Sequence, residues 1–414
     1  MMMKFVFIFF FIPTLSWGLT FKDGKAVEDK SNINLSSDII FAKGFYTDEI
    51  KDCSYMGSET FADQSTVESI RKLIGYDWVK DFEENSTSLT VVHDGITEPM
   101  RSFSIATHNA VGEGNSKKIH IAKEIAIELA KKETLFDTIG YKELKKIKYK
   151  CWERPDSPCW AHAHHFAADV FINYMIASIW LKDFFNEEEY KIIDVYISKM
   201  FKKFIGDKYS EKKLRTDRGI YQMANGGIGI LAYSSWKEDT KLALEEISIR
   251  FAEFEKHFYE DGYINNNSFR GVRSQWYHSL GFNSTLGYIH IAKLWGVDIP
   301  ESINSKLINA SKVTNLAILD YDKFRSRPWK NPNPNMSKNW VEDPSKARKH
   351  THQDAIGIDV LMESLTGIKL ENDEIYFNRR KQYGIDETIG FNPHCLVEEK
   401  EKEQLLKELD FDIN

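Results

Sequence analysis

A succession of amphipathic helical segments joined by short links is the feature that most limits how this chain can fold. Apolar residues recur with helical spacing over 65–74, 119–132, 160–185, 187–205, 219–236, 240–257, 274–295, 301–319 and 353–365. Strand signals are few and short. Successive helices with short connections pair as antiparallel hairpins. We therefore expect an all-α protein whose hairpins form a bundle, a solenoid or an (α/α) toroid.

Three local signals mark helix ends within this pattern. Ser65 with Glu68, and Asn186 with Glu189, have the spacing of a capping box, in which each partner bonds a backbone N–H that the helix leaves free. Gly296 follows the helical segment 274–295 and is expected to end it.

The longest irregular segment is 325–344, where four prolines alternate with asparagines. Its length exceeds that of most connections, which indicates either a functional loop or a disordered excursion. Arg325, Arg327, Lys330 and Trp329 would suit an acidic sugar chain, and a solvated surface explains them equally well.

The first residues have the pattern of a secretory signal peptide. Lys4 precedes an apolar run over 5–12, and the small residues Ser16 and Gly18 fit a cleavage site near Gly18. The apolar run is too short to span a bilayer, and no later run approaches that length. We expect a periplasmic or secreted protein with no membrane span.

We divide the chain into a signal peptide (1–18), a helical domain (19–370) and a charged C-terminal appendage (371–414). Removing Lys4 with the signal peptide changes the net charge from −7 to −8. This charge argues against a nucleic-acid partner, which a general basic field would attract. An anionic substrate would need a local basic patch.

Four cysteines in an exported chain predict one or two disulfides. Cys151 and Cys159 enclose a short loop containing proline and could pair locally, which would leave Cys53 for Cys395. All three connectivities stay open. No C-x-x-C spacing is present, so a metal site on these cysteines is weakly supported.

The most informative stretch runs from Asp261 to His278. Arg270, Arg273 and Tyr277 stand at i, i+3 and i+7, which on a helix places both guanidiniums and the phenol on one face. Two cations beside a phenol favour its phenolate and lower its pKa from about 10, toward a range in which it acts as a base. The alternative is a surface helix with two solvated arginines and a tyrosine packed by its ring.

This stretch resembles the alginate lyase domain of polysaccharide lyase family five. The resemblance is carried by Asp261-Gly262, Arg270-Gly271, Tyr277-His278 and the helix that ends with Leu294-Trp295-Gly296-Val297-Asp298. It includes an arginine seven positions before the tyrosine. It is clearest over about 215–300 and fades to a shared helical rhythm over roughly 100–215.

The resemblance implies an (α/α) toroid whose cleft binds a polyuronate and cleaves it by β-elimination without a metal or cofactor. Tyr277 would take the C5 proton and then protonate the departing O4. Arg270 would stabilise its phenolate and, with Arg273, the substrate carboxylate.

The family's second motif is Asn-Asn-His, about fifty residues before the tyrosine. The comparable region here is Gln222-Met-Ala-Asn225-Gly226, where Asn225 matches the asparagine that neutralises the carboxylate and Gln222 would bind substrate. Gly226 stands where the histidine would be, which weakens the assignment to family five. The related glucuronan lyases share the domain.

A replacement histidine is available in the segment 160–165. His165 and Asp169 at i+4 would form an oriented pair, with His164 beside them. A metal site and buried structural histidines are the alternatives, and the spacing lacks the H-E-x-x-H pattern of zinc proteases. Trp160 flanks this cluster and is a candidate for stacking on a sugar ring.

Trp276 and His278 flank Tyr277 and are the remaining candidates for substrate contact. His278 points about 100° away from Tyr277 on a helix and would then support the site from behind.

Mannuronan-type alginate is the first-choice substrate and glucuronan the second. A glycoside hydrolase using two carboxylates such as Asp261 and Asp354 is one alternative. A non-catalytic protein that binds oligouronates is another. The pattern favours no particular oligomeric state.

Overall fold

The computed structural model describes residues 21–22, 25–26, 59–74, 93–134, 158–202, 220–265, 267–269, 274–327 and 358–368. The side chains of 21–22, 25–26, 158–169, 220–225, 359–360 and 364 lie outside this description. The same holds for the expected signal peptide, the four cysteine side chains and the C-terminal appendage.

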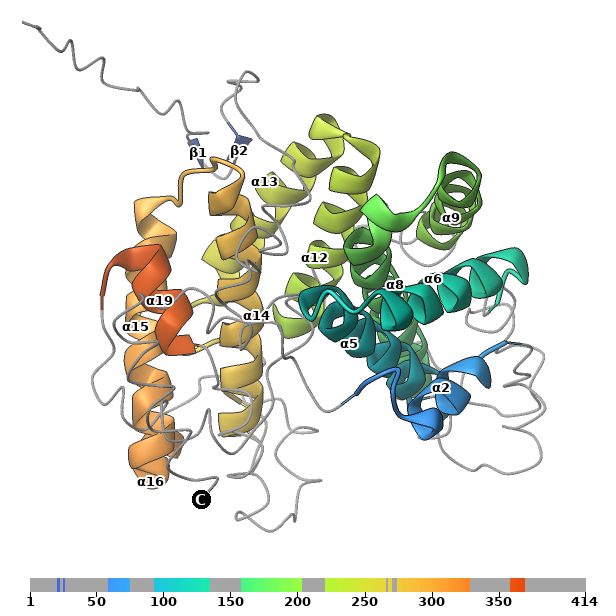
Figure 1. Ribbon diagram of the computed structural model, residues 1–414. Helices are drawn as coiled ribbons and strands as arrows, with labels where there is room; N and C mark the ends of the chain where they lie inside the picture. Colours follow the sequence, from blue (N-terminus) through green and yellow to red (C-terminus); the bar gives the residue numbers. More distant parts are fainter. Residues whose placement is uncertain are drawn as a thin grey trace, which may run out of the picture.

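The described part of the chain is mostly helical (Figure 1). Residues Phe21–Lys22 (β1) and Lys25–Ala26 (β2) form a short antiparallel pair. The helices are α2 (Gln64–Arg71), the π-helix η3 (His93–Thr97), α5 (Glu98–Gly112), α6 (Ser116–Lys131), α8 (Pro158–Leu181), the 3-10 turn η5 (Lys182–Phe184), α9 (Glu187–Met200), α12 (Ile220–Lys237), α13 (Thr240–His257), α14 (Ser274–Leu294), α15 (Glu301–Leu319), α16 (Tyr321–Arg325) and α19 (Ile358–Thr366). This composition confirms the all-α prediction.

The long helices pair as hairpins, and the two helices of each hairpin belong to two different rows. Neighbouring helices pack as α5 with α6, α8 with α9, α12 with α13, and α14 with α15. One helix of each hairpin also contacts the next: α5 packs on α8, α8 on α12, α12 on α14, and α14 on α19. We call these helices the inner row. In the outer row, α6 packs on α9 and α13 on α15.

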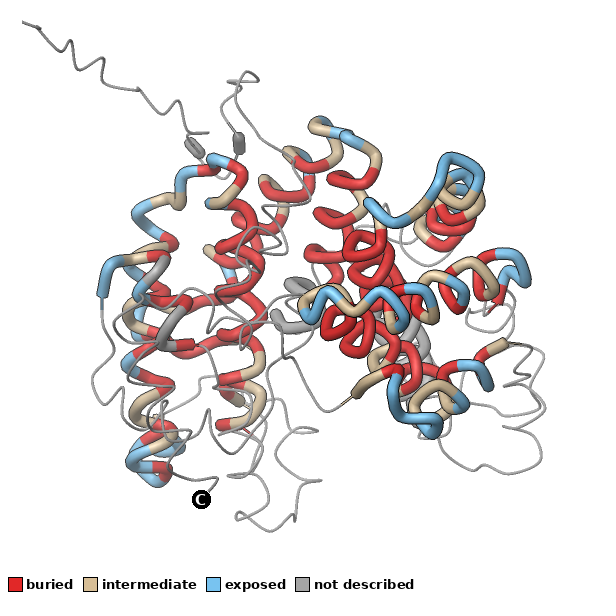
Figure 2. The backbone as a smooth tube through the Cα atoms, viewed as in Figure 1, coloured by how far each residue is buried: buried red, intermediate tan, exposed pale blue. Residues whose placement is uncertain are grey.

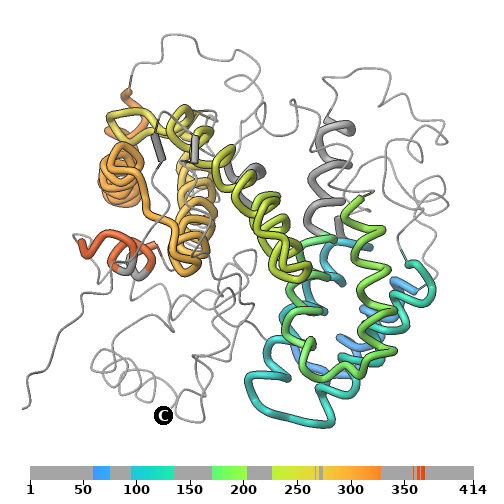
Figure 3. The backbone as a smooth tube through the Cα atoms, turned by 90° about the horizontal axis from the view of Figure 1, so that it is seen from above, coloured from blue at the N-terminus to red at the C-terminus, as the bar shows by residue number. Residues whose placement is uncertain are grey.

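Seen from above, the α12–α13 hairpin lies between the α14–α15 hairpin and the helices that precede it in the chain (Figure 3). The inner row therefore runs through the molecule, and α12 and α14 are its central contact.

The inner row holds most of the core (Figure 2). Every residue from Val170 to Leu181 of α8 and from Gly281 to Ala292 of α14 is buried. Helices α6 and α9 alternate buried and exposed residues, as expected of helices with one face in water. Each fully buried large apolar side chain contributes about 1.5–3 kcal/mol, so these helices dominate the stability of the fold.

Glycines let α12 approach its neighbours closely. A Cβ at Gly227 would lie 2.6 Å from Cε2 of Tyr288 on α14 and 2.7 Å from Oε1 of Glu246 on α13. A Cβ at Gly229 would lie 2.7 Å from Cγ1 of Ile172 on α8. Non-bonded carbon atoms pack best at about 3.5–4.0 Å, so any side chain here would push the helices apart. The glycine-rich segment that departs from the lyase motif thus forms a packing seam.

Most helix limits agree with the sequence prediction. Helices α13 and α15 have the predicted ends, and α14 begins at the predicted Ser274. Gly296 follows α14 with φ of +92°, a conformation that glycine adopts without strain. The capping box at Asn186 is confirmed, because Asn186 and Glu189 each bond the other's backbone N–H at 2.9 Å.

The capping box predicted at Ser65 was wrong by two residues. Asp63 is the N-cap of α2: its carboxylate accepts from the Ser65 N–H at 3.0 Å and from the Ser65 hydroxyl at 2.7 Å. A carboxylate accepts both bonds at once and favours the positive end of the helix.

Other limits were also misplaced. Helix α8 ends at Leu181 and continues as the turn η5, and α9 ends at Met200 instead of residue 205. Helix α5 had no counterpart in the prediction. None of the described helices combines the length and the apolar character needed to cross a membrane.

Candidate functional site

Tyr277 lies in the first turn of α14 and is partly exposed. The Trp276 ring, also partly exposed, lies beside it with ring centroids 5.0 Å apart. The flanking side chains Gln275 and His278 are buried, and the amide of Gln275 donates to the backbone oxygen of Ala317 on α15. Tyr277 and Trp276 therefore form the accessible side of a helix start whose other side is fixed in the core.

Two hydrogen bonds tie this helix start to the segment that precedes it. Nδ2 of Asn267 donates to the backbone oxygen of Tyr277 at 2.7 Å, and Oγ of Ser268 lies 2.7 Å from Nδ1 of His278. Both bonds join residues ten positions apart, so together they close a ten-residue loop. We call this pair of hydrogen bonds the neck. Arg270 and Arg273 belong by sequence to the loop and lie outside the described residues.

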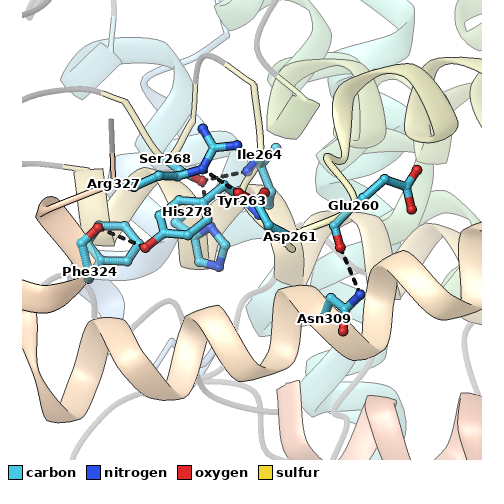
Figure 4. Close-up of polar contacts among 9 residues, drawn as sticks. All are labelled: Glu260, Asp261, Tyr263, Ile264, Ser268, His278, Asn309, Phe324 and Arg327. Carbon is cyan, nitrogen blue, oxygen red and sulfur yellow. Dashed lines mark hydrogen bonds and ion pairs between the residues drawn. The ribbon is translucent and has the colours of Figure 1, made fainter. Parts of the chain in front are cut away.

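The hydrogen-bond partners of His278 favour one tautomer of its ring, and Figure 4 shows the partner on the Ser268 side. Ser268 Oγ accepts from the Ile264 N–H at 2.7 Å, and its own hydrogen finds an acceptor when it is directed to Nδ1 of His278. On the other side of the ring, Nε2 lies 3.1 Å from Oγ1 of Thr314, whose hydroxyl donates to the Ala310 oxygen at 3.0 Å. Nε2 therefore carries the hydrogen and donates to Thr314. Burial lowers the pKa of His278 to about 4, which keeps this ring neutral.

A tight turn places the residues before the neck against α15. Backbone pairing of Phe258 with Ile264 closes the turn, and Gly262 adopts φ of +85° at its tip. A Cβ at Gly262 would lie 2.2 Å from the backbone oxygen of Asn309 on α15. Nδ2 of Asn309 in turn donates to the Glu260 oxygen at 2.9 Å (Figure 4). Glycine is the residue that fits both the dihedral angle and the space.

Asp261 and Arg327 form an ion pair at the edge of this turn. Nε of Arg327 donates to Oδ2 of Asp261 at 2.6 Å, and the guanidinium lies over the rings of Tyr259 and Tyr263, 5.0 and 4.8 Å from their centroids. The Tyr263 hydroxyl donates to the Phe324 oxygen at 2.9 Å (Figure 4). The arginine thus anchors the end of α16 on the turn.

The other predicted site residues lie on helix starts of the inner row. Trp160, His164 and His165 are in the first turns of α8, and Gln222 and Asn225 in the first turns of α12. Their side chains lie outside the described residues, so their contribution to the site stays a prediction. The same holds for Asp354.

Among the described candidates, the structure places Trp276, Tyr277 and His278 together and assigns His278 a supporting position. Its ring is fully buried, so it does not line an accessible surface. Asn267, Ser268 and Thr314 were not predicted. The Asn-Ser pair after an Asp-Gly turn is a sequence signal that could have suggested the first two.

The chain matches no protein-family model, and a search of curated proteins found no match. The resemblance to the alginate lyase domain therefore depends on the residues quoted above.

We expect Gly262→Ala to lower the free energy of unfolding by roughly 2–5 kcal/mol, because strain in the left-handed region and overpacking act together. Gly114→Ala is the matched control: Gly114 has φ of +63° with no atom within 4 Å of a built Cβ. Strain alone should cost it about 1–2 kcal/mol. Urea denaturation measures both, and equal losses would contradict the close contact with Asn309.

Stability should also fall between pH 6.5 and pH 4. Burial lowers the pKa of both His278 and His290 to about 4, so the unfolded chain takes up these protons first as the pH drops. Each histidine should remove about 2–3 kcal/mol between neutral pH and about pH 4.5. Urea denaturation across this range should give a shallower pH dependence for His278→Asn than for the wild type. Identical slopes would contradict the burial of a neutral ring.

Proposed function

We propose that the protein is a polysaccharide lyase that cleaves a polyuronate by β-elimination, with Tyr277 as the base and then the acid. The observation that carries the proposal is a partly exposed tyrosine in the first turn of α14, held from behind by buried and hydrogen-bonded neighbours. A reacting phenol needs both features, because it must reach the substrate and keep one orientation.

The arrangement of helices supports an (α/α) toroid as the fold. Hairpins that follow one another in the chain contribute one helix to the inner row and one to an outer row, which is the layout expected of a toroid. In this proposal the helix starts of α8, α12 and α14 contribute Trp160, Asn225 and Tyr277 to one cleft.

The chemistry divides the proposed roles. The C5 proton of a uronate becomes acidic when the carboxylate is neutralised, a role we give to Asn225 with Arg270 and Arg273. Tyr277 as phenolate removes that proton, and the C4–O4 bond breaks as the double bond forms between C4 and C5. The phenol then returns the proton to the departing O4. His165 is the proposed assisting histidine.

Several predicted residues would bind substrate without reacting. Trp276 and Trp160 would stack on pyranose faces, while Gln222 and His164 would bind hydroxyl or carboxylate groups. We propose mannuronan-type alginate as the first substrate, glucuronan as the second, and a periplasmic or extracellular location.

The hydrolase alternative has less support. A hydrolase needs one carboxylic acid free to protonate the leaving oxygen and a second as base or nucleophile. Asp261 is held by Arg327 in an ion pair at 2.6 Å, so its carboxyl group would have to leave the arginine to reach a leaving oxygen.

Tyr277→Phe should reduce product formation by at least about 10²-fold, because the phenol hydroxyl carries both proton transfers. The assay incubates purified protein with polymannuronate, polyguluronate, glucuronan and pectate, and follows the ultraviolet absorbance of the unsaturated product. Tyr259→Phe is the matched control, since Tyr259 is also partly exposed and lies in the neighbouring turn. It should retain wild-type activity.

The product separates the proposal from its alternatives. An unsaturated end sugar that depends on the Tyr277 hydroxyl supports elimination. New reducing ends without unsaturation identify a hydrolase, and tight binding of oligouronates without any product identifies a binding protein. Full activity of Tyr277→Phe would overturn the mechanism.

A further inference from the structure

A directional chain of hydrogen bonds runs beneath Tyr277 and joins three parts of the fold. It begins at the Ile264 N–H in the turn, passes through Ser268 to His278 on α14, and ends through Thr314 at the Ala310 oxygen on α15. Each hydroxyl uses its single hydrogen to donate and its oxygen to accept, so reversing one bond would leave a buried group unsatisfied. Such a loss costs about 1–3 kcal/mol.

Apolar rings surround the imidazole at the centre of this chain. Tyr263, Phe282 and Phe324 have ring centroids 5.8–6.4 Å from that of His278. The ring is buried, so water does not compete for its nitrogens. A buried, fully satisfied polar network has one favourable arrangement, and the neighbouring backbone is held with it.

The two neck hydrogen bonds connect this ordered network to the backbone of Tyr277. His278 and Tyr277 share a peptide bond, and the Tyr277 oxygen accepts from Asn267, the residue next to Ser268. The adjacent residues Asn267 and Ser268 are therefore bonded to the adjacent residues Tyr277 and His278. These two bonds fix both the position and the direction of the first turn of α14.

We propose that His278, as the neutral Nε2–H tautomer bonded by Ser268 and Thr314, is a positioning residue that orients Tyr277 for proton transfer. This inference rests on the proposed lyase function. His278 does not contact the substrate: it acts through Tyr277.

The proposal differs from a general role in stability. His290 lies on the same helix, is buried to a similar degree, and has its pKa lowered to about 4 by the same cause. It is more than three helical turns from Tyr277 and forms no part of the neck. A purely structural role predicts similar effects for substitutions at both histidines.

The experiment measures kcat and KM for four variants on the substrate that the wild type cleaves best, at a temperature where all are folded. Ser268→Ala and His278→Gln remove the hydrogen bond at Nδ1. We expect kcat to fall by about 10- to 100-fold with KM nearly unchanged, because a small misplacement of a reacting group costs up to about 10²-fold. His278→Asn restores an acceptor near Nδ1 and should recover most of the activity. His290→Asn is the control and should keep kcat.

The proposal would be overturned if activity fell in proportion to the folded fraction, and equally, for substitutions at His278 and His290. It would also be overturned by an unchanged kcat in Ser268→Ala and His278→Gln.

A second measurement does not require turnover: ¹H–¹⁵N spectra of the protein with labelled histidines identify the ring nitrogen that carries the hydrogen. Hydrogen on Nδ1 of His278 would overturn the proposal whatever the activity. A wild type without product on any polyuronate, but with Nε2–H on His278, would refute the lyase function and, with it, the role of His278 in proton transfer.

Discussion

The burial of α14 is the constraint on which the rest of the described structure depends. Helices α12, α15 and α19 pack around it, and its residues from Gly281 to Ala292 are all buried. A helix enclosed in this way must find partners for its polar side chains inside the protein, because unpaired polar groups are costly in an apolar environment. His278 meets this requirement through Ser268 and Thr314, and this pairing fixes how the turn, α14 and α15 fit together.

Close packing against α12 also contributes to the burial of α14. Gly227 leaves the space that Tyr288 of α14 and Glu246 of α13 occupy. Glu246 in turn forms an ion pair at 2.9 Å with Arg250, and both side chains are buried. A buried charge is tolerated when it is paired in this way, so removing either partner would leave the other unpaired. The absence of a side chain at Gly227 is thus a condition for the position of α14.

Helical periodicity and local capping signals were sufficient to predict most of the fold. Helix α13 and helix α15 were found to the residue because their apolar spacing is regular, and because Asp239 caps the start of α13 and Pro300 precedes α15. Helix α5 was missed because its buried face includes polar residues such as Thr107, His108 and Asn109, which hide the apolar period. Pro99 at its first turn was the available signal. The site was predictable where neighbours in sequence are neighbours in space, as for Trp276 and Tyr277. The bond from His278 to Thr314 spans 36 residues and depends on how α14 and α15 pack, which no local pattern contains.

The two neck hydrogen bonds allow the sequence of the loop to change while the start of α14 is kept. Each doubling of loop length costs only about 0.6 kcal/mol of closure entropy. Residues can therefore be inserted or exchanged in the loop between Ser268 and Tyr277 at low cost. Tyr277, Asn267 and His278 would keep their places through such changes, because their hydrogen bonds lie at or beyond the loop's ends. In the proposed lyase, sequence changes in this loop could alter which polymer is bound while Tyr277 is retained.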